Sequence, residues 1–289
     1  MAIDSIAALI EKCGETGLPL WEVILEEDLR ENRGAREDSL RQMRRLWEAM
    51  KTAGEAYRPE ERSRSGLSGG DSAKVQAAAE QGLLLGGSFL NEVIGEALKT
   101  SECNACMKRI VAAPTAGSCG VLPAVLLPLL RRGAEEDAVL QALYVAAGFG
   151  EVIASRASIA GAEGGCQAEV GAASGMAAAA LTQLQGGSPQ ACGHACALAL
   201  SNLMGLVCDP VGGLVEIPCV HRNVVGAVNA LSCANMALAG VESRIPVDEV
   251  IDAMAEVGEK MDDSLKETGN GGLAATPTGR AIARRLQGM

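Results

Sequence analysis

The sequence is poor in aromatic residues and histidine, and it has no cluster of basic residues. Trp, Tyr and Phe occur twice each, so a hydrophobic core must be built from Ala, Leu, Val, Ile and Met. The formal net charge of −11 argues against a nucleic-acid surface, because such a surface needs clustered Lys and Arg. His194 and His221 are the only histidines available for acid–base chemistry.

The sequence also shows neither a secretory signal peptide nor a continuous membrane-spanning segment. The first residues lack the basic segment and apolar stretch of a secretory signal peptide. We therefore expect a cytoplasmic protein, whose ten cysteines are better read as metal ligands or catalytic thiols than as disulfide partners. Residues 170–207 carry no charge, but a Gly-Gly-Ser-Pro turn at 186–189 divides them. A membrane span needs ~20 predominantly apolar residues, so we expect a buried helical hairpin and no membrane contact.

The hydrophobic pattern predicts an all-α protein. Apolar residues recur at helical spacing through residues 6–50 and again through 247–257. The 35 glycines and the alanine runs favour close-packed helices with small residues at their contacts. Gly148-x-Gly150 is too short for a dinucleotide fingerprint. Since no internal repeat or composition break is visible, we predict a single compact helical domain over residues 1–289, with glycine-rich loops converging on one site.

Two glycine-rich polar loops interrupt the helical pattern. Residues 65–71 read Ser-Gly-Leu-Ser-Gly-Gly-Asp and precede a helix expected near Ser72. Their backbone N–H groups could bind an anion, and an ordinary linker is the alternative. The loop has no Lys-Ser/Thr ending, which excludes a nucleotide phosphate loop. Residues 266–274 form the second loop.

A third irregular stretch, residues 109–123, has an apolar run that breaks at Pro114. Small polar residues follow before a helix expected near Leu122. Thr115, Ser118 and the amides of residues 116–120 would lie at a helix N-terminus, which suits a carboxylate. Cys119 could be an activated thiol there, or simply a small buried residue.

Three cysteines stand beside Gly or Pro at irregular turns: Cys166, Cys208 and Cys219. A metal-binding thiolate often needs such a turn, because backbone must approach the sulfur closely. Cys103 and Cys106 form a Cys-x-x-Cys pair, but no second pair lies at zinc-finger spacing, so we expect two thiols on one helix face. The remaining cysteines are expected in the core: Cys13, Cys192, Cys196 and Cys233.

The longer motifs resemble those of the iron–sulfur-dependent L-serine dehydratases. They are Ala-Ala-Pro-Thr-Ala-Gly-Ser-Cys-Gly-Val-Leu-Pro (112–123), Glu-Gly-Gly-Cys-Gln-Ala-Glu-Val-Gly (163–171) and Leu-Val-Cys-Asp-Pro-Val-Gly-Gly-Leu-Val-Glu-Ile-Pro-Cys-Val-His-Arg-Asn (206–223). The loops at 65–71 and 267–274 also look like that family. The likeness runs from about residue 19 to about residue 273 and is to the separate alpha chain of the two-chain type.

The resemblance implies an all-α catalytic domain with a [4Fe-4S] cluster on Cys166, Cys208 and Cys219. It also implies that L-serine contacts Ser65, Ser68, Gly69, Thr115 and Ser118. Two departures from the family stand out. The chain ends in Ala-Arg-Arg-Leu-Gln-Gly-Met, without the cysteine tail that can occupy the fourth iron in single-chain relatives. It also has no regulatory region, so a separate beta chain is the implied partner.

Three thiolates on four irons leave one iron open as a Lewis acid for the leaving hydroxyl. The products would be pyruvate and ammonia. The base that removes the α-proton stays unassigned. Glu169, a group of the beta chain and a serine alkoxide are the alternatives, and the two histidines match no family role.

Other functions are weighed against this one. A cysteine desulfidase could use the same ligands and expel sulfide. A redox-sensing iron–sulfur protein usually has four ligands at short spacings, whereas the spacings here are 42 and 11. A pyridoxal-phosphate enzyme needs a Schiff-base lysine beside a phosphate cup, and of the seven lysines only Lys74 lies near a glycine loop.

Overall fold

The computed structural model describes residues 4–288 and is built from helices; within that range, pairing between extended segments is limited to one isolated β-bridge, Cys208 with Lys266. The all-α prediction is therefore confirmed. In chain order the α-helices are α1 (Ile6–Thr16), α2 (Leu20–Asn32), α3 (Arg36–Ala53), α4 (Asp71–Glu80), α5 (Gly87–Ala105), α6 (Val121–Arg131), α7 (Glu136–Arg156), α8 (Gly161–Gly164), α9 (Ala172–Leu184), α10 (Pro189–Leu203), α11 (Cys219–Leu238), α12 (Val247–Lys260) and α13 (Pro277–Gln287).

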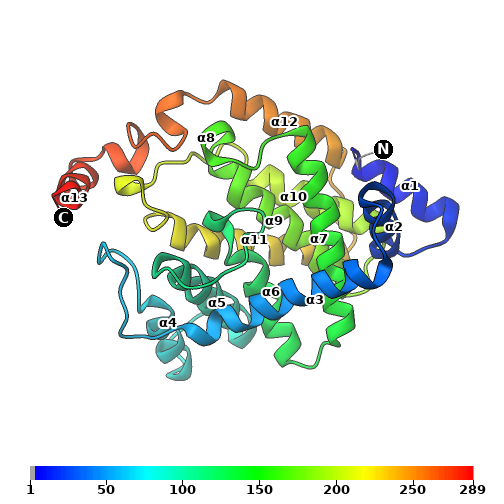
Figure 1. The fold of residues 1–289 in the computed structure, drawn as a ribbon, viewed down its shortest axis with the longest axis horizontal. Coiled ribbons are helices and arrows are strands. Elements are labelled where there is room, and N and C mark those ends of the chain that lie inside the picture. The colour runs from blue at the N-terminus through cyan, green and yellow to red at the C-terminus, as the bar shows by residue number, and fades with distance from the viewer. Residues whose placement is uncertain (1–3, 289) are drawn as a thin grey trace.

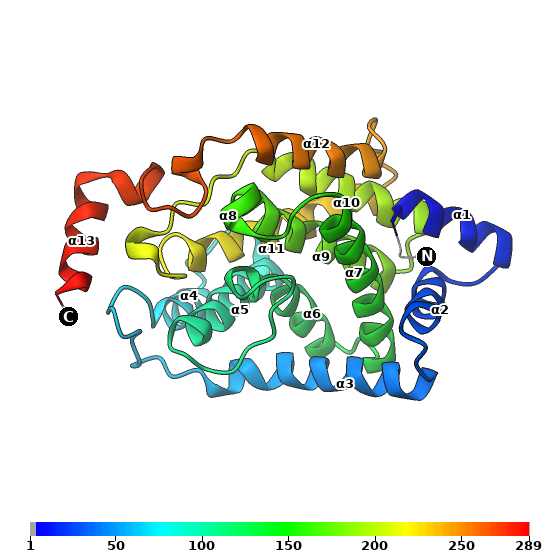
Figure 2. The same ribbon diagram turned by 45° about the horizontal axis from the view of Figure 1, so that its top comes forward.

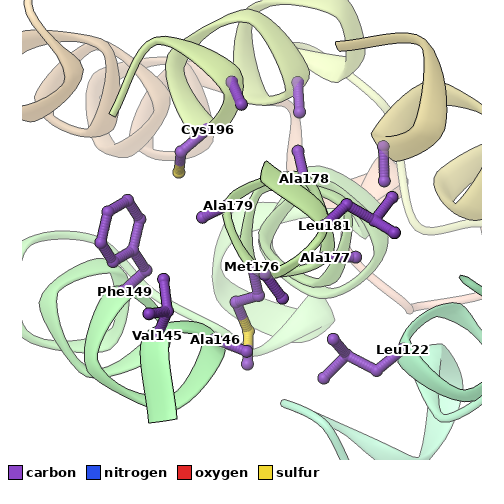
Figure 3. Packing of buried hydrophobic residues seen from close by; sticks show 14 of the residues in the cluster. Leu122, Val145, Ala146, Phe149, Met176, Ala177, Ala178, Ala179, Leu181 and Cys196 are labelled. Carbon is purple, nitrogen blue, oxygen red and sulfur yellow. The ribbon is translucent and has the colours of Figure 1, made fainter. Parts of the chain in front are cut away.

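Helix α9 forms the centre of the core. Every residue from 172 to 182 is buried, and α6, α7, α10 and α11 pack around the helix. Ala177, Ala178 and Ala179 leave α9 in different directions, toward different neighbours (Figure 3). Because alanine side chains are small, helices can approach α9 closely on all sides. A core with so few aromatic residues is filled in this way, as the composition predicts.

Two glycines of α7 show how tight this packing is. A Cβ at Gly148 would lie 2.8 Å from the side chain of Ile24 on α2. A Cβ at Gly150 would lie 2.8 Å from Met176 Cε on α9. The Gly-x-Gly pair therefore serves helix packing, which agrees with its rejection as a nucleotide motif.

The uncharged stretch 170–207 folds largely into α9 and α10, which pack against each other as a buried hairpin. Gly186 adopts a φ of 78° at the turn, and the Ser188 hydroxyl accepts the N–H of Ala191 to cap α10. By length and composition, α7 is the one helix of the described range that could cross a membrane. Of its most apolar window 61% is buried inside the fold, as in a core helix.

The helices at the two ends of the chain lie at opposite ends of the molecule (Figures 1 and 2). Helix α3 runs along one side, and the Trp47 indole N–H donates to Glu136 Oε1 at 3.0 Å, at the start of α7. Three long irregular segments, residues 57–70, 206–218 and 262–276, lie in the half of the molecule that carries α13 (Figures 1 and 2). Cys208 lies in one of these segments and Cys219 directly follows it, whereas Cys166 lies between α8 and the turn that leads into α9.

Candidate active site

Cys166 lies where the chain turns from α8 into the core. Gly165 has a φ of 75°, and a Cβ there would lie 2.7 Å from Met261 Cε and 2.9 Å from the Leu206 carbonyl oxygen. Only glycine suits this position, because it needs a left-handed backbone and leaves no space for a side chain. A π-helical turn, Gln167–Gly171, follows and leads into α9. Such turns are rare and are frequent at functional sites.

Cys208 lies in the extended connection after α10, beside the second glycine-rich loop. Its N–H donates to the Leu265 carbonyl at 2.8 Å, and its carbonyl accepts the N–H of Glu267 at 2.7 Å. The next residue, Asp209, accepts the N–H of Leu273 at 2.7 Å. These bonds fix the loop of residues 266–274 against the Cys208 segment, although more than 50 residues separate them in the sequence.

Cys219 is the first residue of α11 and follows Pro218. A helix N-terminus favours a thiolate, because its unpaired N–H groups and the helix dipole stabilise negative charge. The three thiols are 3%, 3% and 8% exposed at Cys166, Cys208 and Cys219. Each is therefore closed off from bulk solvent.

The three thiols lie within electrostatic range of one another. Burial raises the pKa of Cys166 to about 11 and that of Cys219 to about 12. Burial also raises the pKa of Cys208, and the neighbouring Cys166 and Cys219 add to that rise. Three buried thiols that oppose one another's ionisation become thiolates readily only beside a cation, and a bound metal supplies that charge.

The geometry does not describe a site for one ion. Among residues 4–288 no group of three or more His, Cys, Asp or Glu side chains is close enough to hold a single metal ion. A polynuclear cluster binds each thiolate to a different iron, so its ligand sulfurs need not converge on one point. The donor set and its burial suit such a cluster.

Arg222 lies one turn after Cys219 and faces the other two ligand segments. It donates to the Val207 carbonyl at 2.7 Å and pairs with Asp209 Oδ1 at 2.8 Å. Its charge and hydrogen bond lower the pKa of Cys166 against the larger effect of burial. Arg222 thus supplies positive charge where the thiols need it.

Asn223 joins α11 to the turn at residues 115–118. It is 1% exposed. Its Oδ1 accepts the N–H of Gly120 at 2.8 Å, and its Nδ2 donates to the Gly117 carbonyl at 2.7 Å and to the Cys219 carbonyl at 2.9 Å. One amide side chain therefore holds the turn beside the Cys219 ligand.

Thr115 and Ser118 close that turn as a reciprocal capping box around the 3₁₀ helix Ala116–Ser118. The amides of Ser118, Cys119 and Gly120 already donate to acceptors within the protein. The turn thus offers fewer free N–H groups than the sequence suggests, and the hydroxyls are its main polar groups. The hydrogen bonds of Asn223 hold this turn, with the expected substrate contacts Thr115 and Ser118, beside Cys219.

Glu169 connects this turn to the cysteines. Its Oε1 accepts the Thr115 hydroxyl at 2.8 Å, and its Oε2 lies 3.9 Å from Cys208 Sγ. A Cβ at Gly161 would lie 2.7 Å from Oε2, so that glycine makes room for the carboxylate. Burial raises the pKa of Glu169, and the Thr115 hydrogen bond opposes part of the rise. Glu169 is therefore a partly buried carboxylate of the site and not only a helix cap.

The loop of residues 65–71 is attached to the same region through Glu216. Ser63 Oγ donates to Glu216 Oε2 at 2.6 Å, and Ser65 Oγ lies 2.9 Å from both carboxylate oxygens. Ser68 Oγ is buried and has no hydrogen-bond partner among the described residues. Gly69 has a φ of 125°, and a Cβ there would lie 2.3 Å from the Glu61 carbonyl oxygen. The loop is thus held by hydrogen bonds and closely packed, and such order favours a binding role over that of a linker.

The anion expected at the start of the following helix is supplied by the protein itself. Helix α4 begins at Asp71, and the amides of Asp71 and Ser72 donate to the Glu102 carboxylate at 2.7 and 3.3 Å. Glu102 is 2% exposed. These two N–H groups are therefore not available to a ligand.

The other cysteines lie outside this site. The core prediction is confirmed for Cys13, Cys192, Cys196 and Cys233. Burial raises the pKa of Cys119 to about 12, which describes an inert buried thiol and not an activated one. Cys103 is buried on α5, whereas Cys106 follows the last residue of that helix and is half-buried. The two thiols therefore do not share a regular helix face.

The two histidines contribute little here. His194 is half-buried on α10, and the exposed His221 lies 3.7 Å from Asp71 Oδ2. Four residues that the sequence alone did not single out matter more: Asp209, Glu216, Arg222 and Asn223. Each is a polar residue within four positions of a candidate cysteine in a mostly apolar segment, and that pattern was the available signal.

Fold and site together define an all-α protein in which glycine-rich loops bring three buried thiols, serine and threonine hydroxyls and a carboxylate into one region. Residues 15–274 match the family model described as serine dehydratase alpha chain. The chain belongs to this family.

Relatives named in the same way cover nearly the whole chain. A probable L-serine dehydratase, alpha chain, from Bacillus subtilis (strain 168) is 45% identical over 98% of this chain and 95% of its own length. The L-serine dehydratase, alpha chain, of Peptoniphilus asaccharolyticus is 39% identical over 98% and 97%. L-serine dehydratase 2 of Escherichia coli (strain K12) is 36% identical over 94% of this chain, but the match spans 61% of that longer protein.

Proposed function

We propose that this chain is the catalytic alpha chain of an L-serine dehydratase, which converts L-serine to pyruvate and ammonia with a [4Fe-4S] cluster held by Cys166, Cys208 and Cys219. One observation carries the proposal: Glu169 contacts both Thr115 and Cys208, so a predicted substrate residue and a predicted cluster ligand meet at one carboxylate. The names of the relatives support the reaction.

When bound, a cluster with three thiolate ligands supplies an open iron that acts as a Lewis acid toward the leaving hydroxyl. This chain's own residues bind and orient the amino acid. The buried Ser68 hydroxyl has no hydrogen-bond partner within residues 4–288 and can donate to the substrate carboxylate, with Gly69 allowing the close approach of backbone. Thr115 and Ser118 offer further hydroxyls from the turn of residues 115–118.

Loss of water from serine requires that the α-proton leave as well. The geometry favours Glu169 as its acceptor, because this carboxylate is fixed by Thr115 beside the Cys208 ligand. The released aminoacrylate tautomerises to an imine, and water hydrolyses the imine to pyruvate and ammonia. The protein therefore needs to hold the substrate, exclude water and take one proton.

The test combines cofactor content with turnover. Iron and sulfide would be measured anaerobically in the wild type and in Cys166→Ala, Cys208→Ala and Cys219→Ala, with L-serine turnover measured on each. Cys233→Ala is the matched control, because Cys233 is a buried core thiol. We expect the three ligand variants to lose iron and activity together while the control keeps both. Full iron content in all three variants would contradict the ligand assignment.

Substrate and partner are part of the proposal. The same anaerobic preparation tested with L-cysteine decides between a dehydratase and a desulfidase, and we expect L-serine to be preferred. Because the relatives are called alpha chains, we propose a beta-chain partner, which co-purification with the tagged chain would test. A cytoplasmic location is proposed as well, and the ten free cysteines support it.

A further inference from the structure

Glu216 is a buried carboxylate three positions before Cys219 and is 6% exposed. Two serines of a distant loop donate to it, Ser63 at 2.6 Å and Ser65 at 2.9 Å. Hydrogen bonds to an ionised carboxylate are shorter and stronger than neutral ones. Glu216 is therefore the attachment point of the loop of residues 63–70 on the segment that carries the ligand cysteine.

Ser63 and Ser65 connect Glu216 to the backbone of the rest of the loop. A hydroxyl has one proton to donate, and both serines direct it to Glu216. Their lone pairs accept loop amides, Ser68 N–H on Ser63 Oγ at 3.2 Å and Leu67 N–H on Ser65 Oγ at 3.0 Å. A backbone bond from the Ser63 N–H to the Ser68 carbonyl at 2.9 Å closes the loop. Glu216 thus fixes the backbone at Ser68 through Ser63.

The side chain of Glu216 takes no part in the backbone hydrogen bonds that lead into α11. Its backbone bonds are separate: the Glu216 N–H donates to the Leu214 carbonyl at 2.8 Å, and its own carbonyl accepts the Val220 N–H at 2.9 Å. Meanwhile Ser68 Oγ stays buried without a partner among the described residues, although buried hydroxyls are normally bonded. The carboxylate holds the loop so that this one hydroxyl remains available.

We propose that Glu216 is a positioning residue that acts through Ser63 and Ser65 to present the Ser68 hydroxyl to the carboxylate of the amino-acid substrate. This role rests on the proposed function for its substrate. The attachment of the loop by Glu216 does not depend on the identity of the substrate, because it follows from the hydrogen bonds alone.

The experiment compares Glu216→Ala and Glu216→Gln with Glu60→Ala, an exposed carboxylate on the same segment as the loop. It uses the anaerobically prepared enzyme together with any partner that co-purifies, and it measures kcat and KM for L-serine, iron content and amide hydrogen exchange in residues 63–70. Loss of a charge-assisted bond predicts a rise in KM of about tenfold or more for Glu216→Ala. Iron content stays unchanged, and exchange in the loop becomes faster. Glu216→Gln keeps one acceptor and shows a smaller rise.

Ser63→Ala provides a second route that leaves the carboxylate in place. It should raise KM in the same direction, and the double variant with Glu216→Ala should be less than additive because both remove the same bond. Unchanged KM and exchange in Glu216→Ala, relative to Glu60→Ala, would overturn the proposal, as would loss of iron with unchanged exchange. A wild type that does not turn over L-serine would refute the proposed function, and the exchange measurement would still decide whether Glu216 holds the loop.

Discussion

Replacing Asn223 by Ala tests whether one buried amide holds the turn of residues 115–118 against α11. The change removes the acceptor of the Gly120 N–H and the donor to the Gly117 carbonyl. The Cys219 carbonyl is affected less, since it lies in the first turn of the helix. Each buried polar group left unpaired costs about 1–3 kcal/mol. Two such groups predict a loss of about 2–6 kcal/mol in the free energy of unfolding.

The assay is urea unfolding under anaerobic conditions, followed by circular dichroism. Asn235→Ala is the matched control, because Asn235 lies on the same helix but is exposed. Alanine favours helix over asparagine, so the control should be neutral or slightly more stable. Asn223→Asp adds a finer comparison, since a carboxylate still accepts the Gly120 N–H but cannot donate to the Gly117 carbonyl.

Stability and activity are linked at this residue. Displacement of Gly117 moves the Thr115 and Ser118 hydroxyls, so kcat/KM for L-serine should fall in Asn223→Ala even at temperatures where the protein stays folded. A loss of stability within about 0.5 kcal/mol of the control, with unchanged kcat/KM, would refute the role of Asn223 as the connection between the turn and the ligand helix.

Three further predictions concern neighbouring groups. Gly165→Ala should cost about 1–3 kcal/mol from backbone strain and reduce bound iron, whereas Gly14→Ala, where a Cβ meets nothing within 4 Å, should do neither; equal unfolding midpoints would contradict this. Glu169→Gln should lower kcat by about 10²–10⁴-fold with iron retained, and an unchanged kcat would exclude it as the proton acceptor. Arg222→Met leaves the Asp209 carboxylate buried without its cation, so unfolding should become about 3–5 kcal/mol easier; denaturant midpoints equal to the wild type would show that Asp209 finds another partner.

Much of the fold follows from local patterns in the sequence. The hairpin of residues 170–207 could be predicted because a long uncharged segment is cut by a Gly-Gly-Ser-Pro turn. The amphipathic pattern of residues 247–257 likewise marks α12. Both elements could be predicted because helix formation depends on the spacing of apolar residues that are close to one another in the sequence.

The site could be predicted only where long motifs resemble a known family. The hydrogen bonds from the start of α4 to Glu102 on α5 could not be predicted, because the partners lie about thirty residues apart in the sequence. Glu216 and Asn223 were missed for the same reason: a single polar residue in an apolar stretch does not reveal which distant loop it binds. Pairing between remote segments is set by the packed core, and no local spacing encodes it.

The π-helical turn after Cys166 has a consequence for the orientation of this segment. A helix of this kind holds one residue more per turn than a regular one, so its extra residue sets the rotation between α9 and everything before it. If the same residues wound as a regular α-helix instead, the segment before them would be rotated by about 100° around the axis relative to α9. Cys166 would then be directed away from Cys208, so the wide turn is what lets the ligand segment and the core helix keep their observed orientation.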